Sequence, residues 1–170
     1  MVAYYSRTIV ESVRFRHGDY LKETSMIDGF VGEYRFLSNF FPCTIKYEGL
    51  TYPSTEHAYQ AAKTIDVAQR KAFAIEGREI GLPVLNAGGA KQLGRKIPIR
   101  DDWEEVKLEV MEELLKLKFS QHYFRQQLID TGDEELVESN TWNDTYWGVC
   151  RGIGQNHLGK LLMKVRSKLY

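Results

Sequence analysis

The segment WEEVKLEVMEELLKLKF, residues 103–119, decides the fold because it carries the strongest helical pattern in the chain. Its apolar residues recur at steps of four, four and three positions, which is the spacing of one helical face: Val106, Val110, Leu114 and Leu117. Asp101 or Asp102, just before the pattern, can cap the start of a helix. We therefore expect a long amphipathic helix over these residues.

A β-hairpin and a capped helix are predicted upstream of the long helix. TIKY (44–47) and LTY (50–52) are β-prone, and the intervening Glu48-Gly49 suits a tight turn. The hydroxyl residues at 54–55 can cap a helix that runs to about Ile65.

The remaining segments are assigned from periodicity and glycine content. We expect a strand over TIVESVRF (8–15), a helix from Val67 to about Glu79, a glycine break at NAGGAK (86–91), short helices near 122–130 and 133–139, a loop over 139–156, and a closing amphipathic helix in HLGKLLMKVRSKL (157–169). The sum is a predominantly helical α+β fold, a single compact domain with a small β-sheet or hairpin.

The composition excludes several classes of protein. The 170 residues include 23 basic and 23 acidic side chains, so bulk charge does not hold the chain on nucleic acid or a membrane. Cys43 and Cys150 lack CxxC spacing, and we interpret both as reduced thiols. No apolar run is long enough to span a bilayer, and the first residues lack the apolar centre of a signal peptide. We expect a cytoplasmic protein.

The helix that begins near residue 54 brings polar side chains to one face. Glu56, Gln60 and Lys63 follow one another at steps of four and three, and the alanines lie mostly on the other side. One interpretation is an ordinary solvated face, and the other is a face that carries chemistry into a pocket. His57 has no second ligand at the helical spacing of a zinc site, so a metal role is not expected.

Two further stretches have chemical potential. WNDTYWG (142–148) places aromatic rings beside Asp144 in a loop, where they either plug the edge of the core or form a slot for a flat ring. NAGGAKQLGRK (86–96) combines glycines with Lys91, Arg95 and Lys96, which could hold a phosphate, although the spacing matches neither a P-loop nor GxGxxG. Together with Glu56, these features suit cleavage of a bond between a sugar and a flat nitrogen base.

Several motifs, in their order along the chain, resemble the YbiA-like family of N-glycosidases, also called the NADAR family. They are FLSNF (36–40), YPSTEHAYQAAK (52–63), GRK with DDWEEVK and VMEELLKLKF (94–119), LVESNTWNDTYWGVC (136–150) and QNHLGKLLMKVR (155–166). The resemblance covers roughly residues 30–168. It divides the chain into an N-terminal extension, 1–29, expected to pack on the domain, and a YbiA-like N-glycosidase domain, 30–170.

The resemblance implies a compact, largely helical fold and hydrolysis of an N-glycosyl bond without a metal or cofactor. By motif position, the family's key glutamate falls on Glu56 and its loop acid on Asp144, the expected catalytic pair. The expected substrate-binding residues are Trp103, Trp147, Arg35, Phe36, Ser38, Asn39, Phe40, Tyr59, Lys63 and Arg95. The loop CRGIGQN (150–156) is shorter than the glycine-rich stretch of many relatives, so substrate preference can differ.

Three functions are compatible with these expectations. The first is a hydrolase of ribosylamino-pyrimidine phosphates, which are intermediates of riboflavin biosynthesis. The second keeps the chemistry but removes ADP-ribose from guanine, so that nucleic acid would be a partner only as an ADP-ribosylated substrate. The third is a non-catalytic sensor of a nucleotide-derived ligand. In each case the expected partner is a small phosphorylated molecule and not a membrane.

Overall fold

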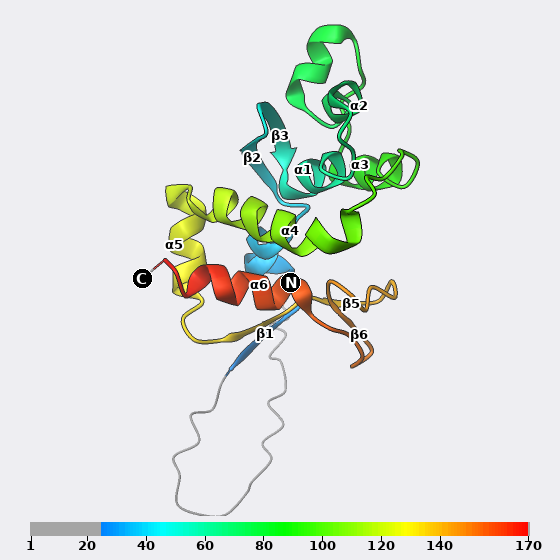
Figure 1. Cartoon of the computed structure of the whole chain (residues 1–170). Coiled ribbons are helices and arrows are strands. Elements are labelled where there is room, and N and C mark those ends of the chain that lie inside the picture. Colours follow the sequence, from blue (N-terminus) through cyan, green and yellow to red (C-terminus); the bar gives the residue numbers. More distant parts are fainter. Residues whose placement is uncertain (1–24, 170) are drawn as a thin grey trace, which may run out of the picture.

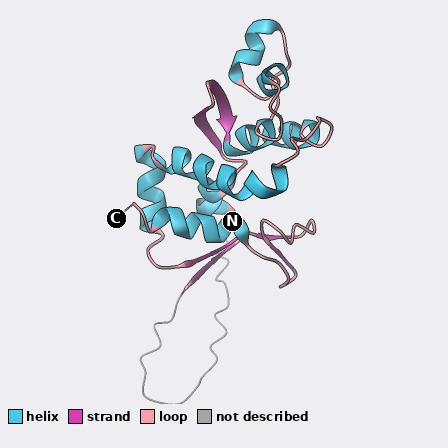
Figure 2. Cartoon of the chain, viewed as in Figure 1, coloured by secondary structure: helices cyan, strands magenta, loops and turns pink. Residues whose placement is uncertain are grey.

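The computed structural model describes residues 25–169 and places helix α4, Trp103–Phe119, at the centre of the molecule (Figure 1). The strand predicted over TIVESVRF and most of the predicted extension, residues 1–24, lie outside the described residues. The other helices are η1 (Gly32–Leu37), α1 (Thr55–Ala61), α2 (Val67–Lys71), η2 (Ile75–Ile80), α3 (Ala87–Leu93), α5 (His122–Asp130) and α6 (His157–Arg166). Helices dominate the picture and the strands are short, so the predicted α+β class is confirmed (Figure 2).

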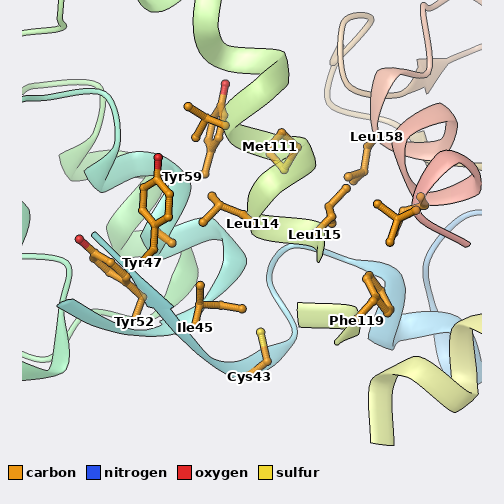
Figure 3. Close-up of a cluster of buried hydrophobic side chains, with 14 of the residues drawn as sticks. Cys43, Ile45, Tyr47, Tyr52, Tyr59, Met111, Leu114, Leu115, Phe119 and Leu158 are labelled. Atoms are coloured by element: carbon orange, nitrogen blue, oxygen red, sulfur yellow. The ribbon is translucent and has the colours of Figure 1, made fainter. Parts of the chain in front are cut away.

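Helix α4 is covered on two sides. It packs against α1 and strand β2 (Pro42–Tyr47) on one side and against α6 on the other, with α5 near its end. Figure 3 shows Leu114 on the side of Tyr59 and Leu115 on the side of Leu158. The helix predicted over 103–119 is therefore correct, but its buried surface is wider than the predicted face: Val110, Met111, Leu114, Leu115 and Phe119 are buried, whereas Val106 and Leu117 are half-buried.

The predicted hairpin is confirmed. Strands β2 and β3 (Leu50–Ser54) are antiparallel, and Tyr47 pairs with Leu50 across the turn. Glu48 and Gly49 both have positive φ, 46° and 80°, the backbone that a two-residue hairpin turn requires for its twist. The alternate residues of both strands are buried, which anchors the start of α1.

Helix α1 begins where the sequence predicts and ends early. The Ser54 hydroxyl oxygen accepts the backbone N–H of His57 (3.3 Å), as expected of an N-cap. The helix ends at Ala61, and Ile65 beyond it is exposed. All seven residues of α1 are buried, because α3, α4 and the two strands of the hairpin pack against it.

Two helical expectations are wrong between residues 67 and 96. The helix expected from Val67 to Glu79 divides into α2 and the 3₁₀ helix η2, where an added side chain at Gly77 would lie 2.2 Å from the carbonyl oxygen of Lys71. NAGGAK is not a break but forms the start of α3. The side chain of Asn86 accepts the N–H of Gly89 (2.7 Å), and this cap with tertiary packing outweighs the weak helical preference of glycine.

The helix predicted near 133–139 is also wrong, because this segment pairs with a distant strand. Strand β4, Glu135–Val137, is parallel to β1, Met26–Asp28, which precedes it by more than a hundred residues. Within the predicted loop 139–156, β5 (Ser139–Asn140) is parallel to β6 (Val149–Cys150). No helix within residues 25–169 has the length and apolar character needed to cross a bilayer.

Candidate active site

A cavity of about 920 Å³ lies between α1, α3, the first half of α4 and the segment from Glu138 to Trp147. This volume lies in the upper part of the range of small-molecule and cofactor sites. The sequence-predicted residues that line it are Ser38, Asn39, Phe40, Glu56, Tyr59, Lys63, Arg95, Trp103, Asp144 and Trp147. Residues distant in sequence therefore converge on one space.

Glu56 presents a buried carboxyl group to this cavity. The residue is 6% exposed, and its backbone N–H donates to the carbonyl oxygen of Asn39 (2.9 Å). The Gln60 amide donates to Glu56 Oε1 (2.8 Å). Burial raises the pKa of Glu56, while the Gln60 hydrogen bond and the charges of Lys91 and Lys63 act in the opposite direction.

The polar face of α1 is turned to the cavity and is not a solvated surface. Gln60 is 4% exposed and lies one turn beyond Glu56, and Lys63 follows at the end of the helix. Gly94 explains how Gln60 fits, because an added Cβ there would lie 1.9 Å from Gln60 Oε1. A glycine at the end of α3 thus lets the side chain that holds Glu56 occupy this position.

Three cationic side chains gather on one side of the cavity. Lys63 comes from the end of α1, Lys91 from α3 and Arg95 from the turn after it. The pKa of Lys63 is lowered, first by burial and then by the like charges of Lys91 and Arg95, although Glu56 opposes this. A bound phosphate would relieve this repulsion, so the cluster favours an anionic group.

Aromatic side chains form a second side of the cavity. The ring of Tyr59 packs against Trp103 (centroids 5.0 Å apart) and against Trp147 (5.4 Å). Trp103 is buried and therefore mainly builds the wall. Trp142, which the sequence analysis quoted but did not assign to the site, lines the cavity and is 60% exposed, so its ring is free to cover a flat base.

The loop contributes two carboxyl groups with different surroundings. Asp144 Oδ1 accepts the backbone N–H groups of Tyr146 (3.2 Å) and Trp147 (2.9 Å). Glu138 also lines the cavity, and its pKa is raised to about 7, first by burial and then by the charge of Asp144, against the opposing effect of Lys91. Sequence reasoning missed Glu138 because the segment around it was expected to be a helix.

The FLSNF motif is divided between the cavity and the core. Ser38, Asn39 and Phe40 line the cavity. Phe36 is buried and packs edge-to-face against Phe119, and Arg35 is exposed on η1, so neither lies at the cavity.

The ammonium group of Lys118, a residue that the sequence did not single out, holds this motif in place. Lys118 is fully buried and its Nζ donates to the carbonyl oxygen of Ser38 (2.9 Å), beneath the part of the motif that binds the N–H of Glu56. Burial lowers the pKa of Lys118 to about 8. The charge is offset by the rings of Phe41, Phe119 and Phe124, whose centroids lie within 5.9 Å.

His57 has a structural position. Its Nε2 lies 3.0 Å from the carbonyl oxygen of Leu85 and its Nδ1 lies 2.7 Å from the Ser54 hydroxyl. A neutral ring that donates to Leu85 and accepts from Ser54 satisfies both contacts, and burial lowers the pKa of His57. Among residues 25–169, no three His, Cys, Asp or Glu side chains are grouped to hold a metal ion.

Comparisons with known proteins agree with this geometry. Residues 26–170 match the model of the NADAR domain family. The chain is 40% identical over 139 residues to the N-glycosidase YbiA of Escherichia coli, covering 81% of this chain and 82% of that protein. It is 38% identical over 144 residues to an N-glycosidase of Nostoc punctiforme, covering 80% and 86%.

A longer relative and a solved structure extend these comparisons. A riboflavin biosynthesis protein of Vibrio vulnificus is 40% identical over 139 residues, which cover 79% of this chain but only 35% of that protein. The solution structure of Escherichia coli YbiA superimposes with a TM-score of 0.74 at 35% identity, covering 88% of this chain and 87% of the other.

Proposed function

This chain belongs to the NADAR domain family, and we propose that its cavity hydrolyses the N-glycosyl bond between a phosphorylated ribose and a pyrimidine in intermediates of riboflavin biosynthesis. It is an enzyme of the N-glycosidase class, like relatives that share most of its length. The observation that carries the proposal is the buried carboxyl group of Glu56, which opens into a cavity lined by cations and aromatic rings.

Glu56 is suited to the charge that develops during the reaction. As the C1–N bond breaks, positive charge builds on C1 and the ring oxygen of the sugar. An ionised carboxylate in a dry site stabilises that charge or takes a proton from the attacking water. Gln60, Lys63 and Lys91 favour the ionised form of Glu56 within a surrounding that otherwise opposes it.

The other walls match the two ends of such a substrate. Lys63, Lys91 and Arg95 provide the positive charge that a ribose phosphate requires. Trp142 and Trp147 provide rings against which a pyrimidine can stack. Asp144, the second member of the expected catalytic pair, also lines this cavity.

A second candidate substrate is favoured by the size of the cavity. A volume of about 920 Å³ exceeds what a single ribosyl-pyrimidine phosphate fills and leaves room for the two phosphates and adenosine of ADP-ribose. Hydrolysis of ADP-ribosylated guanine would use the same carboxylate and the same oxocarbenium-like state. The balanced net charge favours a free nucleotide or an extruded base over tight binding to a duplex.

A hydrolysis assay without added metal tests these proposals. Wild type and Glu56→Gln are given a ribosylamino-pyrimidine phosphate or an ADP-ribosylated guanosine, and products are identified by mass spectrometry. We expect ribose 5-phosphate from the first substrate and a loss of about 10³-fold in kcat for Glu56→Gln, because the amide cannot carry the charge or accept the proton.

A control variant and three further outcomes distinguish the candidate functions. Glu105→Gln makes the same change at an exposed position outside the cavity and should keep the wild-type rate. Release of ADP-ribose alone would select the second substrate. Binding of either compound without turnover by wild type would make the protein a sensor, and full turnover by Glu56→Gln would remove Glu56 from the mechanism.

A further inference from the structure

We propose that Glu138, and not Asp144, is the acid that protonates the leaving nitrogen, an inference that rests on the proposed N-glycosidase function. The family resemblance places Asp144, together with Glu56, in the expected catalytic pair. The structure brings a second carboxyl group into the same cavity, from the end of strand β4. The contacts of the two acids separate their roles.

The backbone of Glu138 is held from two directions. Its N–H donates to the side-chain oxygen of Asn156 (3.1 Å), the residue that precedes α6, and its carbonyl oxygen accepts the N–H of Val149 (2.9 Å). Gly148 packs directly on it, because an added Cβ there would lie 2.1 Å from the Glu138 carbonyl oxygen and 3.0 Å from its Cγ. The backbone of Glu138 is therefore held in a fixed position, and its side chain extends from there to the cavity.

The carboxyl group of Glu138 has one oxygen without a hydrogen-bond partner. Its Oε2 is buried and has no hydrogen-bond partner among the described residues. A buried oxygen without a donor favours the protonated acid, which then has a proton to give. Lys91 and Asp144 each act electrostatically on both Glu138 and Glu56, so the two glutamates share the same neighbours across the cavity.

Asp144 is engaged in a different task. Its Oδ1 accepts two backbone N–H groups, and its own backbone is bonded on both sides by Asn140, whose side chain accepts the Asp144 N–H (3.0 Å) and donates to the Asp144 carbonyl (2.7 Å). These bonds shape the loop that carries Trp147. The charge of Asp144 also contributes to raising the pKa of Glu138 to about 7, with Lys91 opposing it. Asp144 is thus a positioning residue.

The proposed step breaks the C1–N bond and adds one water molecule across it. The C1–N bond breaks and its electron pair stays on the base nitrogen, which takes the proton from Glu138. The oxygen of water bonds to C1, and the proton released by that water goes to the Glu56 carboxylate. One water is consumed, the base leaves with a new N–H and the ribose with a new C1–OH, and exchange with solvent returns both carboxyl groups to their starting states.

The experiment compares Glu138→Gln with wild type over a pH range of about 5.5 to 9, using the substrate that wild type hydrolyses. Glutamine has the same shape but no transferable proton, so kcat should fall by about 10²-fold or more at pH 6. In wild type, kcat should decline as pH rises above about 7, because Glu138 loses its proton there. This alkaline decline should be absent in Glu138→Gln.

Additional variants separate catalysis from structure. Glu138→Ala should regain part of its activity in imidazole buffer at pH 6, since the imidazolium ion carries a transferable proton at that pH and can enter the space left by the side chain. Asp144→Asn should keep the alkaline decline but shift it to lower pH, because a negative neighbour of Glu138 is lost. Glu135→Gln, an exposed glutamate on the same strand, should behave as wild type.

Three results would overturn the assignment. They are a kcat for Glu138→Gln within threefold of wild type, an alkaline decline that persists in that variant, and a wild-type rate that does not decline above pH 7. The third result is measured on wild type alone, so it tests the assignment even if a substitution prevents folding. A wild type inactive on both substrates would instead refute the proposed function itself.

Discussion

The two walls of the cavity are built in different ways. The helical wall, formed by the cavity-lining residues of α1, α3 and α4, has backbone groups that are mostly bonded within their own helices. The loop wall, formed by lining residues between 138 and 147, is held largely by side chains such as Asn140, Asp144 and Asn156. The helical wall therefore places its side chains by local spacing, and the loop wall places them by side-chain bonds within the loop and by bonds from Glu138 to Val149 and Asn156.

An alanine substitution of one glycine at each wall can measure this difference between the walls. Gly94 faces the end of the Gln60 side chain, which can rotate away from an added methyl group. Gly148 faces the carbonyl oxygen of Glu138, a backbone atom that cannot move without displacing β4. The same substitution should therefore affect chemistry at the helical wall and stability at the loop wall.

The largest effect is expected for Gly148→Ala. A Cβ at 2.1 Å from a backbone oxygen forces the loop wall away from β4, and we expect the free energy of unfolding to fall by about 3 kcal/mol. Urea denaturation measures this change. Gly89→Ala on α3 is the matched control, because its added Cβ meets its nearest atoms at 3.4 Å. Equal stability of the two variants would contradict the rigid loop wall.

A smaller effect on stability, together with a loss of catalysis, is expected for Gly94→Ala. The methyl group would displace the Gln60 amide from Glu56, and a hydrogen bond to a charged group contributes about 1.5 to 3 kcal/mol. We expect kcat to fall by about 10- to 100-fold, and the free energy of unfolding to fall by less than in Gly148→Ala, because the end of the Gln60 side chain can move whereas a backbone carbonyl cannot. A large loss of stability with unchanged kcat in the surviving protein would show that Gln60 does not support Glu56.

The smallest effect is expected for Lys91→Met, which removes the cation that acts on both walls. KM for the phosphorylated substrate should rise by about tenfold, because one contact to the phosphate is lost. The alkaline decline of kcat should also move to higher pH, since Lys91 lowers the pKa of Glu138. Lys96→Met, an exposed cation outside the cavity, should change neither quantity.

The elements that were predicted correctly are those set by local contacts, and the elements that were misread are those set by tertiary contacts. The long helix, the hairpin and the capped start of α1 were predicted because caps, turn residues and periodicity act within a few residues of one another. The glycines at 88 and 89 were misread because the cap by Asn86 and the packing of α3 against α1 outweigh local preference. The segment of β4 was misread because its partner β1 is far away in the sequence.

The sequence by itself determined the class of the fold and the helical face that carries Glu56 and Gln60, since a helix converts spacing directly into direction. Only the tertiary structure decided which residues share the cavity. It brought Glu138 and Trp142 to that space and left Phe36 in the core and Arg35 at the surface. The physical reason is that these properties depend on chain segments that meet only after folding. They are the burial of a side chain, the close approach of a residue to a backbone carbonyl of another segment, and the charge of a neighbouring side chain.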